Sequence, residues 1–380
     1  MKIIKALKIR LLPTPEQEEK LWKHINASRF IYNYMLELQI KRYQNNEKHL
    51  TGYNMNRMLT IIKNDGEHDW LYEVSNATLQ RSCSDLAQAY TRFFKKVTRF
   101  PRFKSKKAGN KTFPLSDGIG KVWFNGLTVN IQKVGKVKYQ TNLDVPLGNL
   151  QKFINPRIIY TSNKKWMLIL SIECENQAFK LTNNKMGIDL GVKELAVISY
   201  NNNCLVFHNK NKSKKVKALR NRLKHLQRNL QRKYITNKSY KETNNIRKMK
   251  EKIAKQYYHL SNIQLDYIHK ITHQLIQLKP NRIVMEDLKI TQMRRNKSLA
   301  KAIQEQSFYK FRQIMKYKCD WNEIEFVIAN QYYPSSKRCS QCGSIKKDLK
   351  LKDRIYECPN CGSIIDRDYN AAINLMEYEI

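Results

Sequence analysis

The stretch CSQCGSIKKDLKLKDRIYECPNCGSIIDRDYN, residues 339–370, holds two Cys-x-x-Cys pairs and, five residues after the second pair, a small acidic cluster. The cysteines are Cys339, Cys342, Cys358 and Cys361, spaced C-x2-C-x15-C-x2-C. A glycine follows each pair and permits the tight turn in which backbone amides face the sulfurs. Four thiolates in a tetrahedral array form a closed structural zinc site with no position open for chemistry. The spacing therefore predicts one structural zinc ion, rather than free thiols or an iron–sulfur cluster, that staples this segment.

Because a closed zinc site cannot be the catalyst, the chemistry is expected to lie with carboxylates, and three stand out by their context. Asp189 lies at the end of an apolar strand in MGIDLG, and Glu286 ends the apolar run in RIVMEDL. Asp368 lies just before YNAAINLMEY, a sequence that favours a helix. The three acids are separated by 97 and 82 residues, a separation that neighbouring parallel strands and a helix can close.

Carboxylates that converge in a basic protein repel one another unless cations lie between them. Mg²⁺ and Mn²⁺ prefer such oxygen ligands. Two such ions about 4 Å apart clamp the attacking and leaving oxygens of a phosphodiester. The alternative for each acid, taken singly, is a surface carboxylate or a helix cap.

Two of the candidate acids have acidic neighbours. Asp287 follows Glu286, and because side chains alternate across a strand only one of the two can face a site. Asp366 and Asp368 share a parity if their segment is extended, so local geometry leaves both open.

The charge of the chain points to a polyanionic partner. The 380 residues include 71 Lys or Arg against 32 Asp or Glu, a formal net charge of +39, with 41% hydrophobic residues. Such an excess repels itself unless a polyanion binds it. Nucleic acid fits because counterion release scales with the number of phosphate contacts, and an anionic membrane surface is the alternative. The spread of basic residues over several segments favours nucleic acid.

The sequence predicts a cytoplasmic protein. It has no run of 18 apolar residues that would span a membrane. Lys5, Lys8 and Arg10 interrupt the apolar stretch near the N-terminus, which argues against a signal peptide. The cysteines outside the two pairs are then expected to be reduced thiols. They are Cys83, Cys174, Cys204 and Cys319.

The N-terminal half combines strands and helices. Residues 2–12 suit a strand, and the next residues favour a helix with Thr14 as N-cap, Pro15 at its first position and Gln17 completing a capping box. A second helix is predicted near residues 76–97 from an apolar stripe at spacings of three and four. The stripe is Leu79, Cys83, Leu86, Tyr90, Phe93 and Val97. Residues 119–175 alternate short β-like runs with Gly, Asn and Lys, which predicts an antiparallel β-domain.

Two segments concentrate the basic residues. Residues 99–111, RFPRFKSKKAGNK, mix six basic residues with two phenylalanines that can stack on bases; the alternative is a solvated basic loop. Residues 210–255 hold 18 Lys or Arg and two Glu, with two apolar stripes that predict an antiparallel helical hairpin; the alternative is a solvated helix pair. The candidate nucleic-acid contacts are Arg99, Arg102, Lys104, Lys106, Lys107, Lys214, Lys215, Lys217 and Arg220.

Several motifs, taken as a set, resemble those of the TnpB (OrfB) proteins of bacterial insertion sequences. In the C-terminal half they are MGIDLGVKELAVIS, IVMEDLKI, YYPSSKRCSQCG, YECPNCG and DRDYNAAINL; in the N-terminal half they are RLLPTPEQEEKL, NASRFIYNY and RFPRFKSKK. The resemblance covers nearly the whole chain, and compact type V CRISPR effectors share its nuclease core. The chain departs from the family at NIQLDYIHK, where a more basic stretch is frequent, and this bears only on local RNA contacts.

The resemblance implies a multidomain α+β protein. Its parts are a β-barrel-like nucleic-acid-binding (wedge) domain (residues 1–12 and 99–181), an inserted helical recognition domain (13–98), and a RuvC-like α/β nuclease domain of RNase H fold (186–380) that carries a basic helical hairpin (about 210–275) and a zinc ribbon (about 335–363).

The resemblance also implies an RNA-guided DNA endonuclease of a transposable element. Asp189, Glu286 and Asp368 would hold two Mg²⁺ or Mn²⁺ ions, since the second aspartate of the D-R-D-x-N motif is the family's ligand. A guide RNA would pair with double-stranded target DNA in the bacterial nucleoid, while the protein reads a short flanking motif.

Three other functions compete with this one. They are a compact type V CRISPR effector, a guided DNA-binding protein that no longer cuts, and a structure-specific resolvase without guide RNA. The three carboxylates argue against a protein that no longer cuts, and the extent of basic surface argues against a resolvase.

His269 and His273 are four residues apart on a predicted helix, a spacing that could suggest a metal site. The sequence between them lacks the glutamate of a zincin motif, so we predict that the two histidines pack on the helix surface or in the core. The sequence has no His-x-His pair, so a transposase of the His-hydrophobe-His type is not supported.

Overall fold

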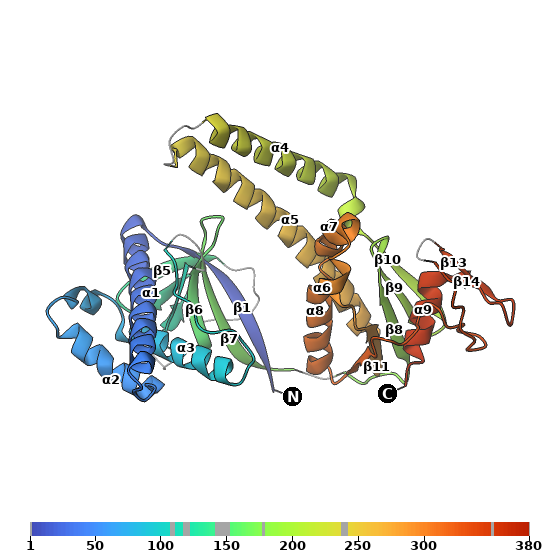
Figure 1. Ribbon diagram of the computed structural model, residues 1–380, viewed down its shortest axis with the longest axis horizontal. Helices are drawn as coiled ribbons and strands as arrows, with labels where there is room; N and C mark the ends of the chain where they lie inside the picture. Colours follow the sequence, from blue (N-terminus) through green and yellow to red (C-terminus); the bar gives the residue numbers. More distant parts are fainter. Residues whose placement is uncertain are drawn as a thin grey trace. The chain divides into compact units, whose positions relative to one another are not determined.

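The computed structural model describes residues 2–106, 111–116, 122–140, 153–176, 179–236, 242–350 and 353–379 (Figure 1). The chain divides into two units, Lys2–Glu175 and Asn176–Ile380, and each has its own sheet and its own buried apolar cluster. Among the described residues, no helix combines the length and the apolar character that crossing a membrane requires.

The N-terminal unit is built on a seven-stranded antiparallel sheet in the order β2-β6-β7-β1-β5-β4-β3. The strands are β1 (Lys2–Leu12), β2 (Lys111–Pro114), β3 (Val122–Asn125), β4 (Thr128–Ile131), β5 (Gly135–Gln140), β6 (Ile154–Tyr160) and β7 (Trp166–Glu175). The predicted N-terminal strand is confirmed as β1, which lies in the middle of the sheet and pairs along β7. Leu7, Ile9 and Leu11 of β1 form one apolar cluster with Leu21 and Ile25 of the first helix.

The helices of this unit are α1 (Pro15–Gln44), α2 (Gly52–Lys63), a 3-10 helix (Asp69–Glu73) and α3 (Asn76–Phe94). The predicted capping box at the start of α1 is confirmed. The Gln17 amide donates to the Thr14 hydroxyl at 3.3 Å, and the Thr14 amide donates to the Gln17 side chain at 3.1 Å. A second apolar cluster joins α1, α2 and α3 through residues such as Leu36, Leu59 and Leu79.

The helix predicted near residues 76–97 forms, but it ends at Phe94. Lys96 adopts a left-handed backbone with φ of 57° and donates to the Phe93 carbonyl, while Val97 donates to the Arg92 carbonyl. This pair of bonds terminates a helix in the Schellman arrangement. Val97 therefore lies beyond the helix and is 71% exposed, so its predicted place in the apolar stripe is wrong.

The C-terminal unit is built on a five-stranded sheet in the order β10-β9-β8-β11-β12. The strands are β8 (Lys185–Leu190), β9 (Glu194–Tyr200), β10 (Asn203–His208), β11 (Arg282–Glu286) and β12 (Glu325–Ala329). The strand pairs β8–β9 and β9–β10 are antiparallel, whereas β11 runs parallel to both β8 and β12. The motif MGIDLGVKELAVIS forms most of β8, a turn and most of β9.

Helices cover both faces of this sheet (Figure 1). The helices of this unit are α4 (Lys214–Thr236), α5 (Asn244–Gln277), α6 (Ile290–Met293), α7 (Lys297–Gln306), α8 (Phe308–Trp321) and α9 (Arg367–Met376), together with a 3-10 turn (Lys210–Lys212). Met186 and Ile188 of β8 pack with α5 and α8, because alternate residues of a strand face opposite sides. Val284 of β11 faces the other side and packs with Leu375 of α9.

The predicted hairpin is confirmed as α4 and α5, which project from the sheet in Figure 1. Val216 and Leu223 of α4 and Ile246 of α5 are buried along the predicted stripes. The Gln256 side chain of α5 donates to the Leu219 carbonyl of α4 at 3.0 Å. Two short strands, β13 (Ile355–Glu357) and β14 (Ile364–Asp366), pair with each other and flank the second cysteine pair, and α9 follows β14 directly.

Candidate active site and metal centre

Two of the three predicted carboxylates lie at the ends of neighbouring parallel strands. β11 pairs with β8 so that Val284 is opposite Gly187 and Met285 is opposite Ile188. The next residues along the two strands are Glu286 and Asp189. Both therefore leave the sheet at the same edge and on the face covered by α9.

The third carboxylate reaches this edge because α9 packs directly on β8. A side-chain carbon added to Gly187 would lie 2.0 Å from the Ala372 carbonyl oxygen and 2.4 Å from the Met376 nitrogen, so only glycine permits this approach. Asp368 is in the first turn of α9. The structure thus brings Asp189, Glu286 and Asp368 to one end of the sheet.

Asp366 has a different structural role from Asp368. Its carboxylate is the N-cap of α9 and accepts hydrogen bonds from the amides of Asp368 and Tyr369, each at 3.0 Å. An N-cap of this kind satisfies amides that have no partner within the helix. Asp366 therefore caps the N-terminus of α9, whereas Asp368 lies in the first turn of that helix.

The electrostatics show that the three carboxylates share one environment. Burial raises the pKa of Asp189 well above its usual value, and Glu286 and Asp368 raise it further. Burial also raises the pKa of Glu286 and of Asp368, although Arg367 opposes the rise in both. Burial therefore disfavours the negative charge of each carboxylate, and at Asp189 the neighbouring carboxylates add to this effect.

This donor set fits a hard divalent cation. Three carboxylates whose charges repel one another offer oxygen ligands and gain from a positive ion between them.

Asp287 lies outside the carboxylate group, as strand alternation requires. Its carboxylate accepts from Arg312 of α8 at 2.9 Å and from Lys289 at 2.7 Å. The hydrogen bond from Lys289 is the main cause that lowers the pKa of Asp287, and Arg312 adds to it. Asp287 is a paired surface acid, and Glu286 is the member of the two that faces Asp189.

Sequence reasoning missed Ser335, which contacts one of the candidate ligands. Its hydroxyl donates a hydrogen bond to Oε1 of Glu286, 49 residues away in the chain. Ser335 belongs to YYPSSKRCSQCG, the motif that contains the first cysteine pair. No local periodicity marks a single serine, so only the motif as a whole could have drawn attention to it.

The four cysteines converge as their spacing predicts. Their sulfur atoms all lie within 4.8 Å of one another, with Cys339 Sγ 3.7 Å from Cys361 Sγ and Cys342 Sγ 3.5 Å from Cys358 Sγ. Gly343 and Gly362, which follow the pairs, have φ of 76° and 70°, the left-handed conformation expected of the two turns. The arrangement of four sulfur donors could hold a zinc ion.

Hydrogen bonds favour the thiolate form of Cys342 in this cluster. A bond with the Ser344 hydroxyl is the main cause that lowers the pKa of Cys342 to about 5, and Asn360 contributes. Tyr356 is fully buried behind the sulfurs and packs with Cys339, Cys358 and Leu349. The thiolate is the form that binds metal.

The basic candidates in residues 99–111 divide into two kinds. Arg99, Arg102 and Lys106 are exposed. Lys104 instead extends over Tyr32, with its ammonium nitrogen 3.7 Å from the ring centroid. Lys107 lies outside the described residues.

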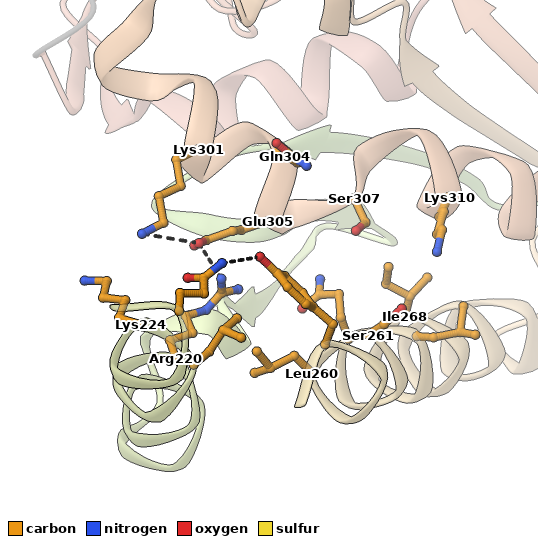
Figure 2. A pocket seen from close by; sticks show the side chains of 15 residues that line it. Arg220, Lys224, Leu260, Ser261, Ile268, Lys301, Gln304, Glu305, Ser307 and Lys310 are labelled. Carbon is orange, nitrogen blue, oxygen red and sulfur yellow. Dashed lines mark hydrogen bonds and ion pairs between the residues drawn. The ribbon is translucent and has the colours of Figure 1, made fainter. Parts of the chain in front are cut away.

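The candidates on α4 also differ. Lys214, Lys215 and Lys217 are exposed on the hairpin. Arg220 is half-buried beside a cavity of about 400 Å³ between α4, α5 and α7, where it forms an ion pair with Glu305 (Figure 2). A second bond, from Arg220 to the Asn211 side-chain oxygen at 2.6 Å, holds the same guanidinium.

Comparison with known proteins shows which protein families the chain resembles. Three family models match it: a helix-turn-helix domain over residues 1–48, a probable transposase of the OrfB kind over residues 169–297, and the TNB domain of Cas12f1-like proteins over residues 308–375. In this chain the first of these segments folds as β1 followed by the single long helix α1.

Two relatives named for RNA-guided DNA endonuclease activity match along almost the full chain. The protein from Streptomyces pristinaespiralis is 28% identical over 98% of this chain and 88% of its own length. InsQ of Escherichia coli is 29% identical over 99% of this chain and 92% of its own length. The CRISPR-associated endodeoxyribonuclease Cas12f1 of Sulfoacidibacillus thermotolerans is 28% identical over 62% of this chain and 56% of its own.

The fold is that of a solved Cas12f1 chain from a complex with guide RNA and target DNA. The two superpose with a TM-score of 0.65 at 14% identity, over 99% of each chain. The protein therefore has the mixed α+β multidomain fold of the compact CRISPR effectors. The matched family models and the named relatives make this chain similar to the TnpB (OrfB) proteins of insertion sequences.

Proposed function

We propose that the protein is an RNA-guided DNA endonuclease of a transposable element, which hydrolyses phosphodiester bonds of double-stranded target DNA beside a short flanking motif. The observation that carries the proposal is the convergence of Asp189, Glu286 and Asp368 from β8, β11 and α9 at one edge of a sheet. The names of the relatives support the same activity and partners, a guide RNA and target DNA.

We infer that the C-terminal unit is a RuvC-like nuclease domain of RNase H fold, and that the N-terminal unit combines the wedge domain with the helical recognition domain. Three antiparallel strands followed by two parallel ones support the first assignment. The seven-stranded sheet packed with α1 to α3 supports the second. The substrate would place the protein at the nucleoid.

In this proposal the residues of the chain divide the work. Asp189, Glu286 and Asp368 would hold two Mg²⁺ or Mn²⁺ ions, which would supply Lewis acids for the attacking and leaving oxygens of the phosphodiester. Gly187 lets α9 approach β8, and Asp366 begins α9, so that Asp368 is held at the strand ends. The four cysteines, whose sulfur atoms lie within 4.8 Å of one another, would hold one structural zinc ion.

The proposal is tested by purifying the chain together with any RNA that it binds and sequencing that RNA. The purified complex is then given a library of DNA that matches the RNA, and cleavage is measured. Cleavage should need Mg²⁺ or Mn²⁺ and stop with EDTA. Asp189→Ala, Glu286→Ala and Asp368→Ala should each abolish cutting but keep RNA and target binding, while the matched control Asp287→Ala should still cut. Absence of copurifying RNA, or cutting by all three alanine variants, would refute it.

A further inference from the structure

We propose that the zinc-binding segment positions Glu286 through the hydroxyl of Ser335, so that zinc binding at the cysteines strengthens divalent-cation binding at the carboxylates. The inference rests on the proposed function for its biological meaning, but it concerns the coupling of two binding sites and can be tested without cleavage. Ser335 is a positioning residue in this scheme, because it acts through Glu286.

The first step is that Ser335 holds the Glu286 carboxylate. Within the described residues, the Ser335 hydroxyl is the one donor that hydrogen-bonds this carboxylate. The bond engages Oε1 of the carboxylate and not Oε2. A carboxylate at the end of a strand can otherwise rotate about its side-chain bonds, so a fixed oxygen restricts where the ligand atom lies.

The second step is that Ser335 is itself fixed. It is only 4% exposed, and its carbonyl oxygen accepts from the Asn374 side chain of α9 at 2.7 Å. Its amide donates to the Tyr333 carbonyl at 2.9 Å. With its backbone anchored on both sides, the hydroxyl presents a donor of fixed position to Glu286.

The third step connects this anchor to the cysteines. One turn of chain runs from Pro334 to Cys339, and the amides of Lys337 and Arg338 both donate to the Pro334 carbonyl at 2.9 Å. The Arg338 carbonyl accepts from the side chains of Asn370 and Asn374, each at 2.7 Å. The residue after this doubly bonded carbonyl is Cys339, a candidate zinc ligand.

A further bond locks the cysteine turn to the same helix. The Ser340 amide donates to the Asn370 side-chain oxygen at 3.0 Å. Asn370 and Asn374 are buried, so their amide groups would lack partners if this turn moved away. Zinc binding, which fixes Cys339, therefore stabilises the arrangement that places Ser335 against Glu286.

Ser335→Ala tests the inference in the full chain, with binding of Mn²⁺ alone followed by electron paramagnetic resonance of the free ion. Outer partners of metal ligands typically contribute 10–100-fold to affinity, so we expect Mn²⁺ to bind at least about tenfold more weakly. Zinc content should stay at one ion per chain. Ser335→Thr keeps the hydroxyl and should restore most of the affinity.

Two controls separate positioning from general damage. Ser336→Ala changes the neighbouring serine of the same turn and should leave Mn²⁺ affinity unchanged. In a Glu286→Gln background, Ser335→Ala should have little further effect, because the residue through which it acts is already altered. Equal losses in both backgrounds would overturn the inference.

Cys342→Ser tests the coupling itself, since Cys342 belongs to the cysteine cluster and not to the carboxylate group. Mn²⁺ affinity should fall when zinc is lost, and it should fall less in chains that already carry Ser335→Ala. The inference would be overturned if the zinc-free Cys342→Ser chain bound Mn²⁺ with unchanged affinity. It would also be overturned if Glu286→Gln left Mn²⁺ affinity unchanged. Failure of the wild-type chain to cut DNA, with this coupling intact, would refute the proposed nuclease alone.

Discussion

Lys104 shows how burial changes the role of a basic residue. Its backbone is held by Asn33, whose side chain accepts from the Lys104 amide at 2.7 Å and donates to its carbonyl at 3.0 Å. Burial lowers the pKa of its ammonium to about 8, against an opposing effect of Asp85 and with a smaller contribution from Arg157. The positive charge of Lys104, which the sequence suggested as a phosphate contact, therefore destabilises the folded chain at its buried position.

Lys104→Met should therefore stabilise the RNA-free chain at neutral pH. The folded pKa of about 8 lies below the unfolded value of 10.5, so the cost of the charge is present in full below pH 8 and disappears as the pH rises through this window. The variant also loses the contact of the ammonium group with Tyr32, which offsets part of the effect. We therefore expect the free energy of unfolding to rise by on the order of 1 kcal/mol at pH 7 and to change little near pH 10.5. Urea unfolding at both pH values measures it.

The matched control is Lys106→Met, which removes an exposed lysine two residues away. It should change stability by less than about 0.5 kcal/mol at either pH. A gain for Lys104→Met that does not depend on pH would show that packing, and not the buried charge, is responsible.

The two aspartates at the start of α9 should respond in opposite ways. Asp366→Ala removes the N-cap and should cost about 1 kcal/mol of stability, with only a modest loss of cutting. Asp366→Ser keeps a capping oxygen, so it should restore both the stability and the cutting. Asp368→Asn should abolish cutting without loss of stability, because its charge is disfavoured in the folded chain. Thermal unfolding and cleavage assays on the same preparations distinguish them. Retained cutting in Asp368→Asn together with none in Asp366→Ser would reverse the assignment.

The sequence predicts a residue's role best where the role follows from position along one element. The alternation of a strand was enough to show that Glu286 and Asp287 face opposite sides. Parity could not separate Asp366 from Asp368, because the segment turns into a helix and Asp366 becomes its cap. The contact of Ser335 with Glu286 joins residues 49 apart, so no local pattern contains it.

At the scale of elements, the packing of α9 on β8 decides where Asp368 lies. Leu375 of α9 is fully buried against Val284 and Val327, which fixes the helix on the sheet. Gly187 sets the closeness of this contact, since the backbone of α9 occupies the space of a side chain there. A change at Gly187 should therefore act on the active site through the whole helix.

Gly187→Ala should displace α9, because the added carbon would lie 2.0 Å from a backbone oxygen that cannot move alone. We expect a loss of about 1–3 kcal/mol of stability, as for other overpacked sites, and a larger loss of cutting than of target binding. Denaturant unfolding and single-turnover cleavage measure the two effects. The control is Gly52→Ala, where the new carbon would lie at an ordinary 3.4 Å from Ala87. Full cutting by Gly187→Ala would show that Asp368 does not depend on this contact.

Periodicity predicted the helices of this chain better than it predicted their ends. The stripes of α3, α4 and α5 are apolar because these faces pack against neighbours, and that signal is local. α3 ends where Lys96 takes the left-handed conformation that usually calls for glycine. Without glycine there, the sequence offers no stop signal, and Val97 continues the spacing beyond the helix.

At the scale of the whole molecule, a net charge of +39 must be neutralised by a partner. The structure shows that the basic residues are not equivalent contributors to this task. Lys214, Lys215 and Lys217 are exposed, whereas Arg220 on the same helix is held by Glu305 and Asn211. Only side chains of the first kind can release counterions when a phosphate binds.

Replacing Lys214, Lys215 and Lys217 together by glutamine should weaken RNA binding and flatten its dependence on salt. Each phosphate contact contributes about one unit to the slope of log affinity against log salt, so the slope should fall by up to about three units. Arg220→Gln should instead lower stability and change the slope little, because its charge is already paired. Target sequence is read by base pairing, so the cleavage products of the triple variant should keep their sequence preference. An unchanged slope would mean that this part of α4 is a solvated helical face, and an altered flanking-motif preference would place it at the DNA duplex.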